Sequence, residues 1–140
     1  MGKINIGRVV VAGIVAGIVM DLFAYLVDGL LLAQLWSDDM ILIGKSEFSA
    51  TQLIEFNLLG IVSGLVAVWI YAAIRPRFGA GVKTAIFAGL AVWIVGVLLP
   101  NASFMYVAGL FSRHLTLYTT LGGLVEVVAG TIAGAALYQE

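Results

Sequence analysis

The chain has 140 residues, of which 62% are hydrophobic and 11% are charged, and its formal net charge at pH 7 is −1. Charged residues alone make up about 25% of a soluble globular domain, so this composition excludes that class. The small negative charge argues against a nucleic-acid partner, and the absence of cysteine excludes disulfides and thiolate metal sites. We therefore expect an integral membrane protein whose surroundings are the lipid bilayer.

The first apolar run extends from about residue 9 to residue 33, long enough to cross a bilayer with some tilt. No small-residue cleavage site follows its basic start, so we interpret it as a retained anchor and not as a cleaved signal. Trp36 lies in the polar exit, where interfacial aromatic residues are typical. Ser37 is a suitable N-cap for a short interfacial helix over residues 38–43.

The second span is predicted over residues 53–74, after a capping box formed by Ser49 and Gln52. We expect it to end in a tight turn at Pro76, because proline removes a backbone donor and the flanking arginines favour water and headgroups.

The third span is predicted over residues 82–100 and should break at Pro100, since proline deep in a helix costs about 3 kcal/mol unless neighbours compensate. Residues 102–111 are apolar but too short to cross alone. They either extend the kinked helix or lie at the interface. The fourth span is predicted over residues 115–138.

Basic residues in the short connections predict the orientation of the spans. One side of the membrane receives five and the other two: Lys3, Arg8, Arg75, Arg77 and Lys83, against Lys45 and Arg113. This bias places both termini in the cytoplasm. The predicted fold class is all-α, a single domain over residues 1–140 that forms an antiparallel four-helix transmembrane bundle with short loops.

Small residues at four-residue steps mark the helix faces that we expect to pack. Such steps stack on one face, and glycine lets two membrane helices approach closely. The candidate packing residues are Gly13, Gly17, Gly60, Gly64, Gly122, Gly130 and Gly134. Residues 10–17 and 127–134 match at six of eight positions, which we interpret as a shared packing preference rather than an internal duplication.

An acid lies in the first and in the last of these glycine stripes, Asp21 and Glu126. Each is about 16–18 Å from the start of its span, near the middle of a core of roughly 30 Å. If the two spans run antiparallel with Gly130 near Gly17, the two carboxyls come close together. No basic residue lies at that depth, so we expect at least one carboxyl to be protonated.

Two interpretations of these acids stay open. They form a proton or cation site that includes Tyr25, or they are hydrogen-bonded acids that fix the helix register through Tyr25, Thr119 or a backbone carbonyl.

A second polar cluster is expected at the outer ends of the spans. Its members are Asp28, Glu55, Asn57, Asn101, Arg113 and His114. Carboxylates and imidazole suit several metals, but the spacing matches no metal motif, so we assign no metal site and favour an ion pair of Arg113 with Asp28 or Glu55. Phosphate-loop, hydrolase and haem or zinc motifs are missing, so we predict no catalytic residue and no cofactor.

Three segments resemble a widespread group of small bacterial four-helix membrane proteins of unassigned function. They are Ile4–Val9, Ala72–Gly79 with its Arg-Pro-Arg turn, and Gly122–Val128. The resemblance implies a bacterial source and four spans, and it transfers no activity. For such a source we expect the protein in the inner membrane. Where that group tends to have a Glu-Phe pair in the first span, this chain has Asp21-Leu22-Phe23.

Taken together, these features favour a non-enzymatic accessory or assembly subunit that packs on other membrane helices, or on copies of itself, through its glycine-lined faces. The alternative is a small oligomeric proton- or cation-coupled transporter that uses the mid-membrane carboxyls, similar in outline to the small multidrug-resistance exporters. A further alternative is a quinone- or pigment-binding membrane subunit, flanked by the interfacial aromatic residues.

Overall fold

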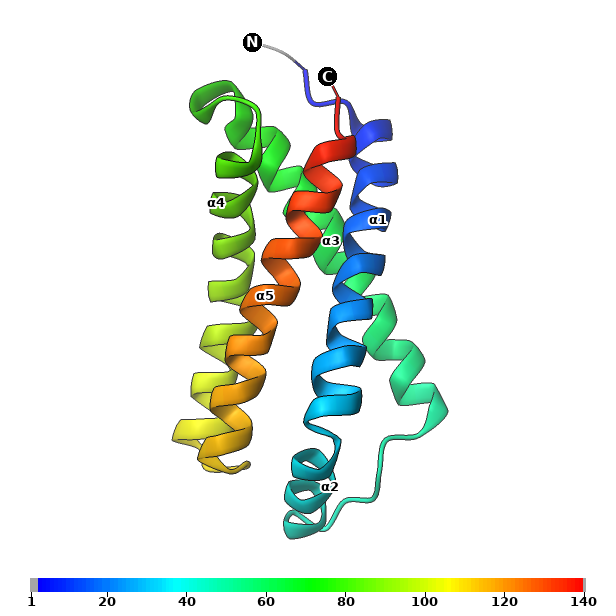
Figure 1. The fold of residues 1–140 in the computed structure, drawn as a ribbon, viewed down its shortest axis with the longest axis vertical. Helices are drawn as coiled ribbons and strands as arrows, with labels where there is room; N and C mark the ends of the chain where they lie inside the picture. The colour runs from blue at the N-terminus through cyan, green and yellow to red at the C-terminus, as the bar shows by residue number, and fades with distance from the viewer. Residues whose placement is uncertain (1–2, 140) are drawn as a thin grey trace.

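The computed structural model describes residues 3–139, which are helical for most of their length and contain no strand (Figure 1). Four helical segments are long and apolar enough to cross a membrane, namely Ile6–Leu31, Ala50–Phe78, Val82–Val107 and Arg113–Leu137. The prediction of four apolar helices in a helical bundle is confirmed, and their lengths and compositions are those of a multi-pass membrane protein.

The two ends of the described chain lie together at one end of the bundle, which we call the terminal end (Figure 1). The backbone N–H of Asn5 donates to the hydroxyl of Tyr138 there, at 3.2 Å. The opposite end carries the short helix α2 (Ala33–Leu42) and is called the α2 end.

The first span consists of α1 (Ile6–Ala24) and a π-helical segment, η1 (Tyr25–Leu31). After a bend at Leu32 the chain continues directly into α2, so the short helix begins earlier than predicted. Ser37 is therefore inside α2 and is not its N-cap. The short helix expected over residues 38–43 is present, but it begins five residues earlier. The carbonyl of Leu32, at the bend, starts it by accepting from Trp36 N at 3.0 Å.

The second span is α3 (Ala50–Phe78), and its predicted capping box of Ser49 and Gln52 is confirmed. We expected the helix to end before Pro76, but it includes this residue and continues to Phe78. The missing N–H of Pro76 removes one helical hydrogen bond, that to the carbonyl of Ala72, and the helix continues for only two residues beyond the proline. The helix ends at Gly79, whose φ of 84° favours glycine.

The third span combines α4 (Val82–Trp93) with two π-helical segments, η2 (Ile94–Leu98) and η3 (Asn101–Val107). The predicted break at Pro100 was wrong, because the helix widens on both sides of the proline. In a π turn the hydrogen bonds span five residues instead of four, so the N–H that proline lacks is not needed. The wider turn also moves the carbonyl four residues earlier away from the proline ring. Of the two possibilities for residues 102–111, extension of the helix is therefore the one found, as far as Val107.

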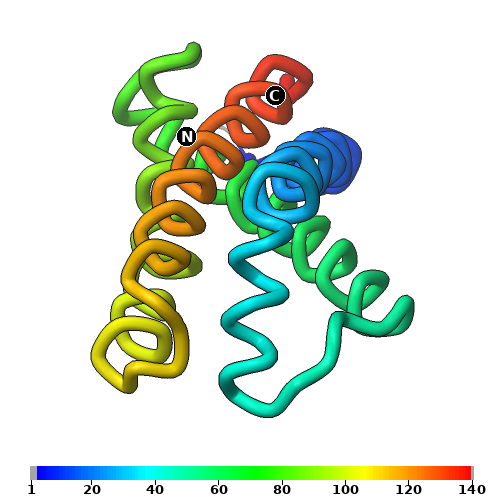
Figure 2. Tube along the Cα trace, turned by 60° about the horizontal axis from the view of Figure 1, so that its bottom comes forward, coloured from blue at the N-terminus to red at the C-terminus, as the bar shows by residue number. Residues whose placement is uncertain are grey.

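The fourth span is α5 (Arg113–Leu137), capped by Ser112, whose hydroxyl accepts from Leu115 N at 3.2 Å. In Figure 1 α5 passes in front of α3, with α1 on one side and α4 on the other. The largest buried apolar cluster lies in the half of the bundle nearer the terminal end. It is formed by small residues of α1, α3, α4 and α5, together with Tyr71 and Tyr138. Toward the α2 end the helices diverge, and the first half of α3 stands away from the others (Figure 2).

Candidate functional site

The glycine face of α1 packs on α3. A Cβ on Gly13 would lie 2.7 Å from Leu65 Cα, and a Cβ on Gly17 would lie 2.5 Å from Ile61 Cα. From the other side, Gly64 meets the backbones of Gly13 and Gly17. The two helices are therefore in backbone contact, which residues larger than glycine would prevent.

The glycines of α5 pack on a different face of α1. A Cβ on Gly130 would lie 2.7 Å from Ala16 O, and a Cβ on Gly134 would lie 2.8 Å from Ala12 O. Gly130 therefore lies beside Ala16, the neighbour of Gly17, but it does not contact the glycine face of α1, which packs on α3. Because α1 has two neighbours, its glycine stripe serves α3 and the adjacent alanine stripe serves α5.

Asp21 continues the glycine face of α1 and lies over Gly60 of α3. A Cβ at position 60 would overlap the carboxyl of Asp21. Asp21 is partly buried and forms no hydrogen bond with any residue in the described part of the chain. Its side chain thus occupies a site created by the missing side chain of Gly60.

Glu126 lies between the glycines of α5 that face the first span, since Gly122 contacts Val27 of η1 and Gly130 contacts α1. Its carboxyl interacts electrostatically with Asp28 and, more weakly, with Asp21. Side chains tilt toward the N-terminus of their helix, and α5 begins at the α2 end, where η1 carries Asp28. The pair expected from depth alone is therefore part of a group of three acids, in which Asp28 is the stronger neighbour of Glu126.

Asp28 also holds α2 in place. Its carboxylate accepts a hydrogen bond from Trp36 Nε1 at 3.0 Å. The Trp36 ring in turn makes edge contacts with Phe48 and Phe111, at centroid distances of 5.9 and 5.5 Å. One carboxyl thus links the group of three acids to the short helix at this end of the bundle.

Sequence reasoning did not identify Asp39, which anchors α2 from its other side. Asp39 is only 5% exposed, and its Oδ2 accepts from Ser112 N at 2.7 Å. An acid at a helix N-terminus is favoured by the helix dipole. The signal in the sequence was an acid two residues after Ser37. Because the surrounding stretch is polar and follows the first span, the sequence analysis placed Asp39 in a solvent-exposed connection.

The remaining outer polar residues do not form one cluster. The amide of Asn101 donates to the hydroxyls of Thr119 and Thr120, at 3.4 and 3.0 Å. Arg113 lies over the ring of Tyr106, 5.6 Å from its centroid. His114 lies beside Tyr118, with ring centroids 6.4 Å apart.

The expected ion pair of Arg113 with Asp28 or Glu55 is absent from residues 3–139. Instead, Glu55 and Asn57 lie on the exposed first half of α3, and the amide of Asn57 donates to Leu53 O of its own helix at 2.6 Å. Among the residues that the structure describes, no three His, Asp or Glu side chains are placed to hold a metal ion.

Neither hydroxyl expected near the acids hydrogen-bonds to them. Tyr25 is 60% exposed, and its ring lies against Gly29. The hydroxyl of Thr119 donates to Leu115 O at 2.9 Å.

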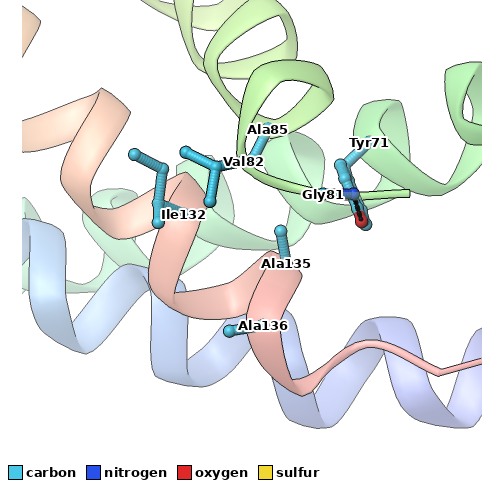
Figure 3. A pocket seen from close by; sticks show the side chains of 7 residues that line it. All are labelled: Tyr71, Gly81, Val82, Ala85, Ile132, Ala135 and Ala136. Carbon is cyan, nitrogen blue, oxygen red and sulfur yellow. Dashed lines mark hydrogen bonds between the residues drawn. The ribbon is translucent and has the colours of Figure 1, made fainter. Parts of the chain in front are cut away.

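A cavity of about 110 Å³ lies at the terminal end, between the start of α4 and the end of α5 (Figure 3). Its lining is apolar apart from Tyr71, whose hydroxyl accepts from Gly81 N at 3.1 Å. The cavity therefore offers space but no charged group to orient a ligand.

Comparison with known proteins adds no further assignment, because no family model, curated protein or solved structure matches the chain.

Proposed function

We propose that this protein is an accessory or assembly subunit that associates with transmembrane helices of another protein through the first half of α3. In this proposal it is an antiparallel four-span bundle in a bacterial inner membrane, with both termini cytoplasmic. The observation that carries the proposal is that residues 50–59 contain no buried side chain on any face of the helix.

The glycine faces do not supply this surface, because they are occupied within the chain. The first half of α3 remains, where Ile54 and Leu58 are 62% and 60% exposed. Apolar exposure alone suits lipid, but Glu55 and Asn57 are exposed on the same segment. Polar side chains in membrane spans usually face other helices, and asparagine can hydrogen-bond across a helix pair.

The position of Asn57 indicates where a partner helix fits. It lies four and seven residues before Ile61 and Gly64, and therefore on the face of α3 that contacts α1. In the first span, Tyr25 is the first residue of η1 and follows Asp21 by four residues, so it continues the face that Asp21 shares with the glycines. The first half of α3 diverges from the first span toward the α2 end (Figure 2). In this proposal a partner helix lies between the two segments and contacts Asn57 and Tyr25.

Site-specific photo-crosslinking in native membranes tests this proposal. A photoreactive residue replaces Ile54, and the matched control replaces Val66, which is 43% exposed on the second half of the same helix. We expect a discrete protein adduct at position 54 and none at position 66. Lipid adducts alone at both positions would contradict the proposal, and an adduct at twice the mass of the chain would identify the partner as a second copy.

The transport alternative is favoured by one observation, the electrostatic grouping of Asp21, Asp28 and Glu126. Among the described residues no basic side chain interacts with any of the three. Unpaired intramembrane acids are typical of proton and cation pathways. If they act in this way, proteoliposomes show proton-coupled flux that is lost in Asp21→Asn and Glu126→Gln, whereas an assembly subunit shows no flux in either form.

A further inference from the structure

A groove runs between the end of the third span and the beginning of α5, two segments that lie side by side in Figure 2. Its volume is about 240 Å³. One wall is formed by Leu98, Ala102 and Tyr106, at four-residue steps, and the other includes Arg113, Thr116 and Thr120.

The groove extends from the membrane interface inward. Arg113 is the first residue of α5, and Thr120 lies seven residues further along the same helix. At 1.5 Å per residue this separation is about 10 Å, or a third of the thickness of the hydrocarbon core.

The interior of the groove is apolar although two threonines line it. The hydroxyl of Thr116 donates to Ser112 O at 2.9 Å, and that of Thr120 donates to Thr116 O at 2.6 Å. Thr120 Oγ1 also accepts from Asn101 at 3.0 Å. Because both hydroxyl protons are used within the protein, neither threonine offers the groove a free hydroxyl donor.

The mouth of the groove carries one positive charge. Arg113 is exposed, and its guanidinium is held over the Tyr106 ring. No acid lines the groove or forms an ion pair with Arg113 within the described chain. The nearby Asp39 carboxylate accepts from Ser112 N instead. A guanidinium in this setting suits the bidentate hydrogen bonds that a phosphate accepts.

We propose that this groove binds an anionic membrane phospholipid. The headgroup phosphate lies on Arg113, and part of one acyl chain lies between the two walls. The groove is smaller than the roughly 300–1,000 Å³ pockets that enclose a whole drug-sized ligand. It therefore takes a segment of one chain while the rest of the lipid remains in the bilayer. This inference does not depend on the assembly role proposed above.

The test is native mass spectrometry of the purified full chain, titrated with phosphatidylglycerol or with phosphatidylcholine. We expect tighter binding of phosphatidylglycerol, weakened about tenfold by Arg113→Gln, as expected for the loss of one charge-assisted contact. Arg113→Lys should retain part of the affinity, because the charge remains without the bidentate geometry. The matched control is His114→Gln, which changes the adjacent residue outside the groove and should bind as the unaltered chain does.

A second variant tests the apolar part of the site. Ala102→Phe fills the groove without touching the charge, so it should also reduce binding. If this variant does not fold, the Arg113 series decides alone.

Three results would overturn the proposal. They are equal binding of the two lipids, unchanged binding in Arg113→Gln, or full displacement of phosphatidylglycerol by inorganic phosphate, which would identify a simple anion site.

Discussion

The carboxyl of Asp21 on α1 occupies the space that a Cβ would fill at Gly60 on α3. An acid and a glycine thus form one contact between two of the long apolar helices. The absence of a side chain at Gly60 makes room for the carboxyl of Asp21, and α3 covers this carboxyl on one side.

Gly60→Ala should therefore destabilise the protein by about 1–3 kcal/mol, as overpacking does at a tight contact. The measurement is the free energy of unfolding in mixed detergent. Gly96→Ala is the matched control, because no other atom lies near a Cβ at that position in the third span. In the Asp21→Ala background the effect of Gly60→Ala should shrink, and equal effects in both backgrounds would show that the two residues are not coupled.

The hydrogen bond from Trp36 to Asp28 predicts different effects for two substitutions of Asp28. Asp28→Asn keeps an acceptor oxygen for Trp36 Nε1, whereas Asp28→Leu leaves this donor without its partner. We expect the fluorescence of Trp36, measured in a Trp69→Phe, Trp93→Phe background, to change in the leucine variant and to stay close to the original in the asparagine variant. Identical spectra in all three proteins would argue that this bond does not hold α2.

The contact of Asp39 with Ser112 N predicts a stabilising role for a residue in a surface helix. Asp39→Ala should cost about 1–2 kcal/mol, since it removes a capping acceptor and a charge at the N-terminus of α5. Asp38→Ala is the control, because Asp38 is exposed and bonds only Gln34 of its own helix, at 2.8 Å. Unfolding free energies that fall equally in both variants would contradict the assignment.

The placement of α5 between η1 and η2 can be tested by disulfide cross-linking, because the chain contains no cysteine. A Cβ on Gly122 would lie 3.5 Å from Val27 Cβ, and a Cβ on Gly123 would lie 3.6 Å from Val97 Cβ. Both distances suit a disulfide. We expect Val27→Cys to cross-link with Gly122→Cys, and Val97→Cys with Gly123→Cys. The exchanged pairs serve as controls, and efficient cross-linking in them would show that α5 is rotated from this position.

Much of the fold is determined by local sequence. Four apolar runs specify four long helices, because hydropathy and length act within each segment. The capping box at Ser49 and Gln52 is equally local, and it was found where the sequence predicted it. The ends of two helices were less predictable. Pro76 is accommodated in the last turn of α3, and Pro100 is accommodated by the widened π-helical segment that follows it.

The tertiary structure alone decided which helix each face contacts. The stripe of Gly13 and Gly17 permits close packing of another helix but does not specify which one. Both α3 and α5 pack on α1, and the glycine stripe contacts α3. The acids are a second example. Their positions along the spans predicted that Asp21 and Glu126 lie close together, whereas the direction of the side chains makes Asp28 the stronger neighbour of Glu126. Sequence periodicity determines the helix face on which a residue lies and its position along the helix. Which residue it contacts on another helix depends on how all the helices pack together, and this is known only from the tertiary structure.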